Sequence, residues 1–459
     1  MQLIANMTIV ALPNISESLN FSADIIMWVN LIYLLSFVAF SLPFAKVISQ
    51  YGIKKCTKIS LILLFVSGLL SFLSVNQYMF LLSRLMQGLT SASLAISIYV
   101  MIVEEFSESA LGTALGMVSS AGYIGMLMAP SFMGFMIYIA NWRYAFLILI
   151  PILGILLYIL HNIEHEWSSE KKPIDNIGSV IYVVAMILFS YGITELKKFG
   201  LIFLIITLVL IVIFIKVEKR FEDPILNLNL FKNIRYVIGN YAAMATYFTT
   251  TITITALSLH LQYVLTIGEY IVGMILIIAP IIMIGMSNIG GMLTNKYDPR
   301  VISGIAMLFL FMSTSLFFVL DFIPFELILV ACALQGIGNG LFSAPNNKYV
   351  LTIVDKKDLA DASSVLSSSK EFGKILSAGI YSLILSIFVG NQALGPKHLN
   401  PLLIQSTNAM MFICLLITLS AAILLFYSKF GFKDEGYNPK VIEIFKSIEP
   451  ERIKKRRKS

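Results

Sequence analysis

The chain has 459 residues, of which 58% are apolar and only 13% are charged, and its mean hydropathy is +0.85. A soluble protein has about 25% charged residues, so this composition excludes a set of water-soluble domains and predicts a protein embedded in a bilayer. The net charge of +7 does not indicate nucleic-acid binding, because the basic residues lie in short runs between apolar segments. Three widely spaced cysteines predict no disulfide framework, and no metal site or cofactor is expected.

Apolar segments follow one another along the whole chain. A helix needs about 20 apolar residues to cross ~30 Å of hydrocarbon. The sequence predicts fourteen such spans, at 1–19, 25–45, 57–75, 78–103, 112–139, 143–161, 177–195, 199–216, 237–265, 270–293, 301–320, 327–345, 362–389 and 402–427. The first span is short and partly polar, as expected of either a truncated helix or a start upstream of Met1.

Lysine and arginine are distributed unequally between alternate loops, and most of them fall on the same side as the N-terminus. Because basic loops remain in the cytoplasm, we expect a multi-pass plasma-membrane protein with both termini inside the cell. The tail at 428–459 ends in a basic run, Arg452–Lys458. Beside a membrane such a run is expected to bind anionic lipid headgroups, at about 1 kcal/mol per charge.

Two parts of the chain resemble each other. The segment at 45–55 follows the second span and resembles the segment at 291–300, which follows the tenth. Gln87-Gly88 and Gln335-Gly336 match at nearly the same offset. Such repeats are typical of transporter halves. We therefore predict six-helix bundles at 1–161 and 237–427, two inserted helices at 177–216, and the basic tail at 428–459.

Short motifs appear in a characteristic order along the chain. Ala5–Pro13 is similar to L-D-x-T-I-V-x-x-A-L-P, with Asn6 at the aspartate position, and a G-x-L-a-D-r-x-G-r-k loop motif places Ser49 at its aspartate. Further motif residues are Trp28, Val29, Tyr33, Gly52, Lys54, Arg84, Gln87, Gly88, Gly122, Gly125, Pro130, Gly134, Trp142 and Arg143. In this order the motifs resemble the fourteen-helix drug/proton antiporter branch of the major facilitator superfamily.

That resemblance implies an all-α integral membrane protein with the major facilitator fold, working as a monomer and not as an enzyme. It implies a secondary active transporter that exports amphipathic or lipophilic small molecules by alternating access, with proton antiport. The motif aspartates are replaced, however. A proton-independent or differently coupled transporter therefore stays open as an alternative, as does a membrane-embedded protein without transport, such as a sensor.

Arg84 lies well inside an apolar span, where a guanidinium costs at least ~2.5 kcal/mol. It therefore requires a carboxylate, backbone carbonyls or water, unless it reaches the outer headgroups; the resemblance links it to proton transfer. In the next span Gly122, Gly125 and Ala129 form a smooth stripe that favours close helix packing, and Pro130 bends the helix. Ordinary small-residue packing explains the stripe equally well.

One face of the ninth span is polar: Thr246, Thr249, Thr250, Thr253 and His260 share it on a helical wheel. Polar groups in a span face the protein interior or a water-filled cavity, so this face is predicted to line the substrate pathway. Threonine can instead bond to the carbonyl one turn back, which is the structural alternative.

The loops after the second and tenth spans are predicted to form a gate, with Gly52, Lys54, Lys55, Asn295, Lys296 and Arg300. Lys370 and Glu371 are expected at a solvated helix end, or else as an ion pair to a gate. The acids near spans are expected at span ends, so proton coupling would have to use His260 or one of Asp24, Glu104, Glu195, Asp321 and Glu371.

Overall fold

The computed structural model describes residues 1–21, 28–165, 167, 175–194, 199–221, 224–390 and 400–430. Thirteen helices among these residues are long and apolar enough to cross a bilayer. They are preceded by α1, which has 17 residues, so the helices follow the fourteen predicted spans in order. Asp24, Glu195 and the tail at 431–459 lie outside the described residues.

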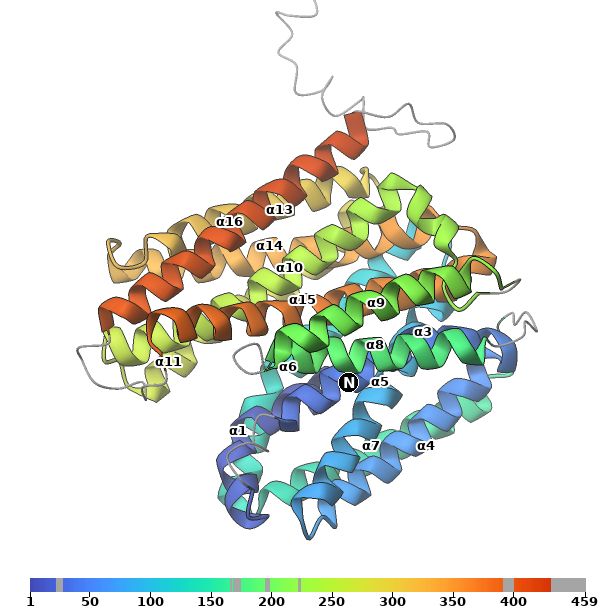
Figure 1. Ribbon diagram of the computed structural model, residues 1–459, viewed down its shortest axis with the longest axis horizontal. Helices are drawn as coiled ribbons and strands as arrows, with labels where there is room; N and C mark the ends of the chain where they lie inside the picture. The colour runs from blue at the N-terminus through green and yellow to red at the C-terminus, as the bar shows by residue number, and fades with distance from the viewer. Residues whose placement is uncertain are drawn as a thin grey trace, which may run out of the picture.

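The first six helices pack together and occupy the lower part of Figure 1. Within this N-terminal group α5 packs against both α3 and α4, α6 packs against α1, and α7 packs against α4. The helices are α1 (Gln2–Ser18), α3 (Trp28–Tyr51), α4 (Ile53–Phe72), α5 (Gln77–Glu105), α6 (Glu108–Ile139) and α7 (Trp142–Asn162).

The C-terminal group occupies the upper part of Figure 1, and α13 packs in it against both α14 and α16. Its elements are α10 (Ile234–Leu259), the π-helical turn η2 (His260–Val264), α11 (Glu269–Leu276), α12 (Ile278–Leu293), α13 (Pro299–Phe318), α14 (Phe325–Thr352), the short η3 (Lys356–Asp358), α15 (Leu359–Phe388) and α16 (Asn400–Phe430).

The tenth predicted span is not one continuous helix. It is divided into α11 and α12 at Ile277. Pro280 has no N–H to donate to the carbonyl of Leu276, four residues earlier, and Leu276 is where α11 ends. The missing bond gives a physical reason for the break.

Two further helices, α8 (Asn176–Thr194) and α9 (Gly200–Glu218), form an antiparallel pair, followed by the short η1 (Leu228–Lys232). In Figure 1 this pair lies between the two groups, and α8 packs against α3 of one and α15 of the other. The inserted helices therefore border both groups.

Several helices are longer than hydropathy predicted. The expected loop at 46–56 shrinks to one residue, Gly52, whose φ of 91° suits glycine. Lys46 thus lies in α3, while Lys54 and Lys55 lie in the first turn of α4. Lys46, in the extra turns of α3, pairs with Asp361 of the opposite group. We call the end of the molecule that holds this turn the basic end.

Candidate functional site

An ion pair joins the two groups at the basic end. Lys46 of α3 places Nζ 2.9 Å from Oδ2 of Asp361 of α15, and both side chains are buried. Farther along the same helices, the hydroxyls of Ser41 and Ser368 are in contact. A buried lysine needs such a partner, because an unpaired charge in the interior costs several kcal/mol. We call the Lys46–Asp361 pair the latch.

On the other side of the boundary, α6 meets α12 and α14. The Asn295 side chain accepts a hydrogen bond from the Gly112 N–H at 3.0 Å and donates to Thr113 Oγ1 at 2.7 Å. Lys348 donates to the backbone carbonyls of Glu108 and Thr294, each at 2.9 Å. Asn295 thus ties the two groups together.

A set of aromatic and charged side chains lies between the two groups: Tyr247 and Lys374 are near the middle of α10 and α15, and Tyr99 and Asn347 lie toward the basic ends of α5 and α14. Lys370 donates to Tyr99 Oη at 3.0 Å and to Asn347 Oδ1 at 2.7 Å. Lys374 lies 2.8 Å from Glu371 Oε1, and its ammonium lies 5.3 Å from the ring centre of Tyr247. The central cluster is defined as Tyr99, Tyr247, Asn347, Lys370, Glu371 and Lys374.

Three further contacts extend this region. Tyr123 Oη donates to the Asn339 carbonyl at 3.2 Å, Thr250 Oγ1 donates to Asn339 Oδ1 at 2.6 Å, and Ser119 bonds to Ser343 at 2.9 Å. Tyr123 is near the middle of α6 and Asn339 near the middle of α14. The hydrogen bonds described here between the two groups all lie between this level and the basic end.

Lys370 and Glu371 do not lie at a solvated helix end; that prediction is wrong. Each is only 7% exposed and lies well inside α15, which begins at Leu359. One carboxylate oxygen of Glu371, Oε2, has no hydrogen-bond partner among the described residues. The boundary drawn from hydropathy was misplaced because serines and charges occupy the first turns of a helix that is nevertheless buried.

Arg84 is fully buried and does not reach the headgroups. It donates to the carbonyls of Ile4 at 3.1 Å and Val29 at 3.2 Å, and to Gln87 Oε1 at 2.8 Å. Its guanidinium also lies 4.8 Å from the ring centre of Tyr33. All four partners belong to the N-terminal group, so Arg84 ties α1 and α3 to α5 rather than one group to the other.

The neighbouring motif residues serve the same packing. A Cβ at Gly88 would overlap Ser36 and the Tyr33 carbonyl, so only glycine allows α3 and α5 this close. Asn6, at the aspartate position of the first motif, donates to the Gln2 carbonyl of its own helix at 2.7 Å.

The small-residue stripe of α6 faces α1. A Cβ at Gly125 would lie 3.2 Å from the Leu3 nitrogen, and one at Gly122 would lie 3.7 Å from Gln2. Pro130 is exposed, and Gly134 has open space beside it. The stripe therefore packs within the N-terminal group.

The residues predicted to form one polar face of α10 lie in different surroundings. Thr246 and Thr253 are buried and bond to carbonyls one turn back, and Thr246 also contacts Met307 of α13. Thr249 is likewise buried. Thr250 alone of the predicted five reaches the central region, through Asn339.

His260 lies away from the central cluster. It is 1% exposed, and its Nε2 lies 3.6 Å from Oδ1 of Asp321, in the turn after α13. Burial raises the pKa of the Asp321 carboxyl. Tyr247 was not among the residues predicted from the helical wheel, yet it is the residue of α10 whose ring lies beside Lys374.

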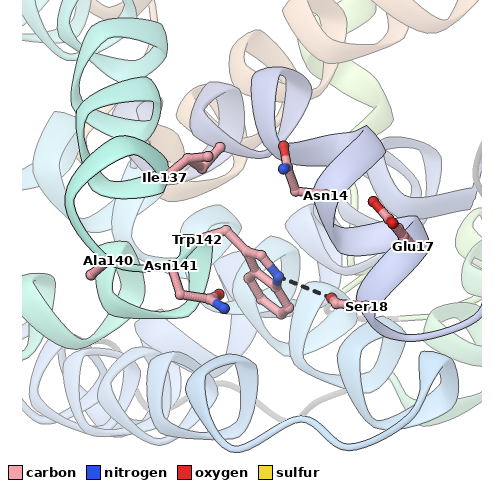
Figure 2. A pocket seen from close by; sticks show the side chains of 7 residues that line it. All are labelled: Asn14, Glu17, Ser18, Ile137, Ala140, Asn141 and Trp142. Carbon is pink, nitrogen blue, oxygen red and sulfur yellow. Dashed lines mark hydrogen bonds between the residues drawn. The ribbon is translucent and has the colours of Figure 1, made fainter.

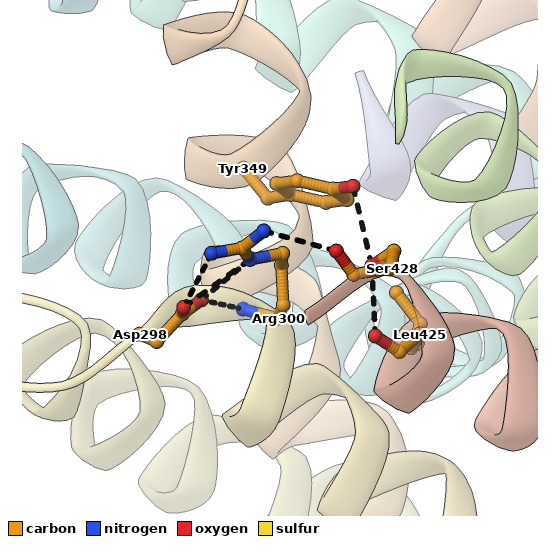
Figure 3. Close-up of polar contacts among 5 residues, drawn as sticks. All are labelled: Asp298, Arg300, Tyr349, Leu425 and Ser428. Carbon is orange, nitrogen blue, oxygen red and sulfur yellow. Dashed lines mark hydrogen bonds and ion pairs between the residues drawn. The ribbon is translucent and has the colours of Figure 1, made fainter. Parts of the chain in front are cut away.

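The residues predicted to form a gate do not lie together at one site. Lys55 and Lys296 are exposed, and Lys54 is half-buried. Arg300 is buried, pairs with Asp298 at 2.8 Å and donates to the Ser428 carbonyl at 3.1 Å, as Figure 3 shows. Tyr349 bonds to the Ser428 hydroxyl. In these contacts Arg300 fastens α13 to α16 inside the C-terminal group.

A cavity of about 360 Å³ lies at the end opposite the basic end, between α1 and the turn from α6 to α7 (Figure 2). Trp142 Nε1 donates there to Ser18 Oγ at 3.0 Å. Its lining residues are Asn14, Glu17, Ser18, Ile137, Ala140, Asn141 and Trp142. None of these belongs to the central cluster, so the cavity is separate from it.

Comparison with known proteins identifies the class. The chain matches the family model of the Major Facilitator Superfamily over residues 1–222 and 241–457, and it therefore belongs to that superfamily of membrane transporters. It is an integral membrane protein with the major facilitator fold, and not an enzyme.

Particular relatives are distant. The chain is 24% identical to the riboflavin transporter RibZ of Clostridioides difficile over 378 residues, covering 81% of this chain and 82% of that protein. It is 24% identical to the drug efflux pump JefA of Mycobacterium tuberculosis, covering 84% and 78%. The structure of the proton:xylose symporter XylE aligns with a TM-score of 0.65 at 14% identity, covering 97% and 96%.

Removing one partner of the latch should loosen the basic end. In Asp361→Asn, Lys46 stays buried without a carboxylate, which costs about 3–5 kcal/mol for a buried pair. We expect faster labelling of the buried Cys56, which lies at this end of α4, by N-ethylmaleimide, followed by peptide mass spectrometry. The matched control is Asp355→Asn, whose carboxylate is exposed. Equal labelling rates in the two variants would contradict a closing role for the latch.

Proposed function

We propose that this transporter exports amphipathic, ring-bearing small molecules across the plasma membrane by alternating access, driven by proton antiport. The observation that supports the proposal most directly is the central cluster. It lies between the two helix groups, extends from the middle of α10 and α15 toward the basic end, and combines aromatic rings with charged side chains. A transported solute has to be bound at such a level, where either end of the protein can give access to it.

The chemistry of the cluster favours a particular kind of solute. Tyr99 and Tyr247 offer ring faces and hydroxyls, while Lys370 and Lys374 together with Glu371 leave one positive charge in excess. Aromatic rings bind flat apolar bodies, and the excess ammonium favours an acidic group. We infer that ring systems with a negative group bind better than organic cations. Relatives named as a riboflavin transporter and a drug efflux pump are compatible with ring-bearing solutes.

The access side follows from charge. The positive-inside rule places the basic end, and both termini, in the cytoplasm. With the latch, the Asn295–Gly112 bond and the Lys348–Glu108 bond made, that end is closed. In the proposed cycle, residues 1–161 and 237–427 rock against each other, with 177–216 beside them, and these bonds break as the cytoplasmic end opens.

Glu371 is the best-placed group for proton coupling. It is a buried carboxyl in the central cluster, paired to Lys374 through one oxygen and without a partner on the other. Protonation would break the ion pair with Lys374, so taking up or losing a proton changes the charge that the cluster presents in the two halves of the cycle. Arginine, including Arg84, cannot take this role because it does not deprotonate.

The substrate class is tested with Lys374→Gln. Losing a hydrogen bond to a charged group costs about 1.5–3 kcal/mol, so transport of a fluorescent aromatic anion should fall at least about tenfold. Transport of an aromatic cation such as ethidium should fall much less. The control is Thr255→Leu, exposed on α10. An unmodified protein that moves the cation and not the anion would exclude the proposed substrate class.

Coupling is tested in proteoliposomes with an imposed pH gradient. Substrate flux should follow the gradient, collapse with a protonophore, and become indifferent to the gradient in Glu371→Gln, because the variant cannot bind a proton there. Gradient-independent flux in the unmodified protein would favour facilitated diffusion or another ion. Absence of any flux, with a range of aromatic solutes, would favour the sensor alternative.

A further inference from the structure

Two buried carboxyl groups face each other at the basic end of the inserted helices. Asp175 precedes α8 and Glu218 ends α9, and they are 0% and 2% exposed. Gly178, in the first turn of α8, lies beside both, and a Cβ there would overlap Asp175 Oδ2 and Glu218 Oε1. The two oxygens therefore point into the same small space, which exists because residue 178 has no side chain.

In each carboxyl, one oxygen accepts a hydrogen bond and the other does not. Asp175 Oδ1 accepts from the Gly178 N–H at 2.9 Å, and Glu218 Oε2 accepts from the Leu226 N–H at 3.1 Å. The facing oxygens, Asp175 Oδ2 and Glu218 Oε1, are both buried and have no hydrogen-bond partner among the described residues. Buried polar atoms nearly always form hydrogen bonds. Two facing carboxyl oxygens without partners therefore indicate that one of them carries a proton and donates it to the other.

Two carboxylates that face each other out of water repel strongly, and a single proton placed between the two facing oxygens removes that repulsion. That proton donates from one orphan oxygen to the other and satisfies both. The described residues contain no group of three acidic, histidine or cysteine side chains suited to a metal ion, and two carboxylates fall short of such a set.

The pair lies next to the latch. Ala45 and Ala360, the chain neighbours of Lys46 and Asp361, pack in one buried cluster with Leu226, whose N–H donates to Glu218. Glu218 is close enough to Lys46 and Asp361 for their charges to act on it, and Tyr236 of α10 belongs to the same cluster. The ionisable groups at this level are therefore Lys46 and the carboxyls of Asp175, Glu218 and Asp361. When the acid pair holds its proton, Lys46 has Asp361 as its strongest partner; when the proton leaves, the doubly charged pair attracts Lys46 away from the latch.

We propose that Asp175 and Glu218 form a proton-binding site in the inserted helices, and that its single shared proton holds the latch closed. Raising the pH removes the proton and releases the latch. This site is separate from Glu371 and the central cluster, and the inference depends neither on the substrate class nor on antiport.

The test uses the full-length protein in nanodiscs. Spin labels are attached at Tyr51→Cys and Lys356→Cys, two exposed positions. The distance between the labels reports the separation of the two groups at the basic end. The native cysteines, Cys56, Cys332 and Cys414, are replaced by serine. With Asp175 and Glu218 intact, the short distance should dominate at low pH and give way to a longer one as the pH rises, with the slope of a single proton. Asp175→Asn and Glu218→Gln should each abolish this pH dependence and remain closed.

Two controls should retain the response: Asp355→Asn, an exposed carboxyl at the same end, and Glu371→Gln. Loss of the response in Glu371→Gln with its survival in Glu218→Gln would assign the proton to the central cluster and overturn the proposal. A distance that does not change with pH in the unmodified pair would also overturn it. Infrared titration of the unmodified protein does not depend on whether the variants fold. The absence of a protonated carboxylic C=O band near neutral pH would rule out the shared proton.

Discussion

A charged side chain inside a membrane protein has to find its partner in the protein, because the hydrocarbon offers none. In this transporter Lys46, Lys348 and Lys370 find theirs on the opposite helix group. The contacts that offset the cost of burying these charges are therefore the contacts that close the basic end. Opening that end exposes the same lysines to water, which compensates for the bonds that are lost.

The buried polar groups thus fall into two kinds. Arg84 and Arg300 bond within one group each, to partners that move with them, and so they stabilise the groups as units. Lys46 and Lys370 bond between groups. On this view a substitution at Arg84 damages the N-terminal group itself, while a substitution at the latch changes how often the two groups part.

The number and order of the membrane spans could be predicted from sequence, since both follow from the length of the apolar segments. The helix ends could not, because hydropathy treats polar turns as loops; Lys46 and Lys348 were assigned to loops and lie in helices. The partners could not be predicted either: Lys46 and Asp361 are 315 residues apart.

A helical wheel shows which residues share a face, but it does not show which neighbour that face meets. The polar face of α10 was found, yet only Thr250 of its five residues reaches the central region. Tyr247 and the acid pair of Asp175 and Glu218 were missed, because tyrosine and isolated acids near span ends give no distinctive pattern. Their roles follow from side chains that other helices supply.

The central claim is that the basic end must open for transport. Cysteines in place of Ser41 and Ser368, whose hydroxyls are in contact across the boundary, should form a disulfide that ties α3 to α15. Flux of the aromatic anion through proteoliposomes should stop when the pair is oxidised and return on reduction, while either single cysteine variant should transport under both conditions. Undiminished flux through the fully cross-linked protein would contradict the account.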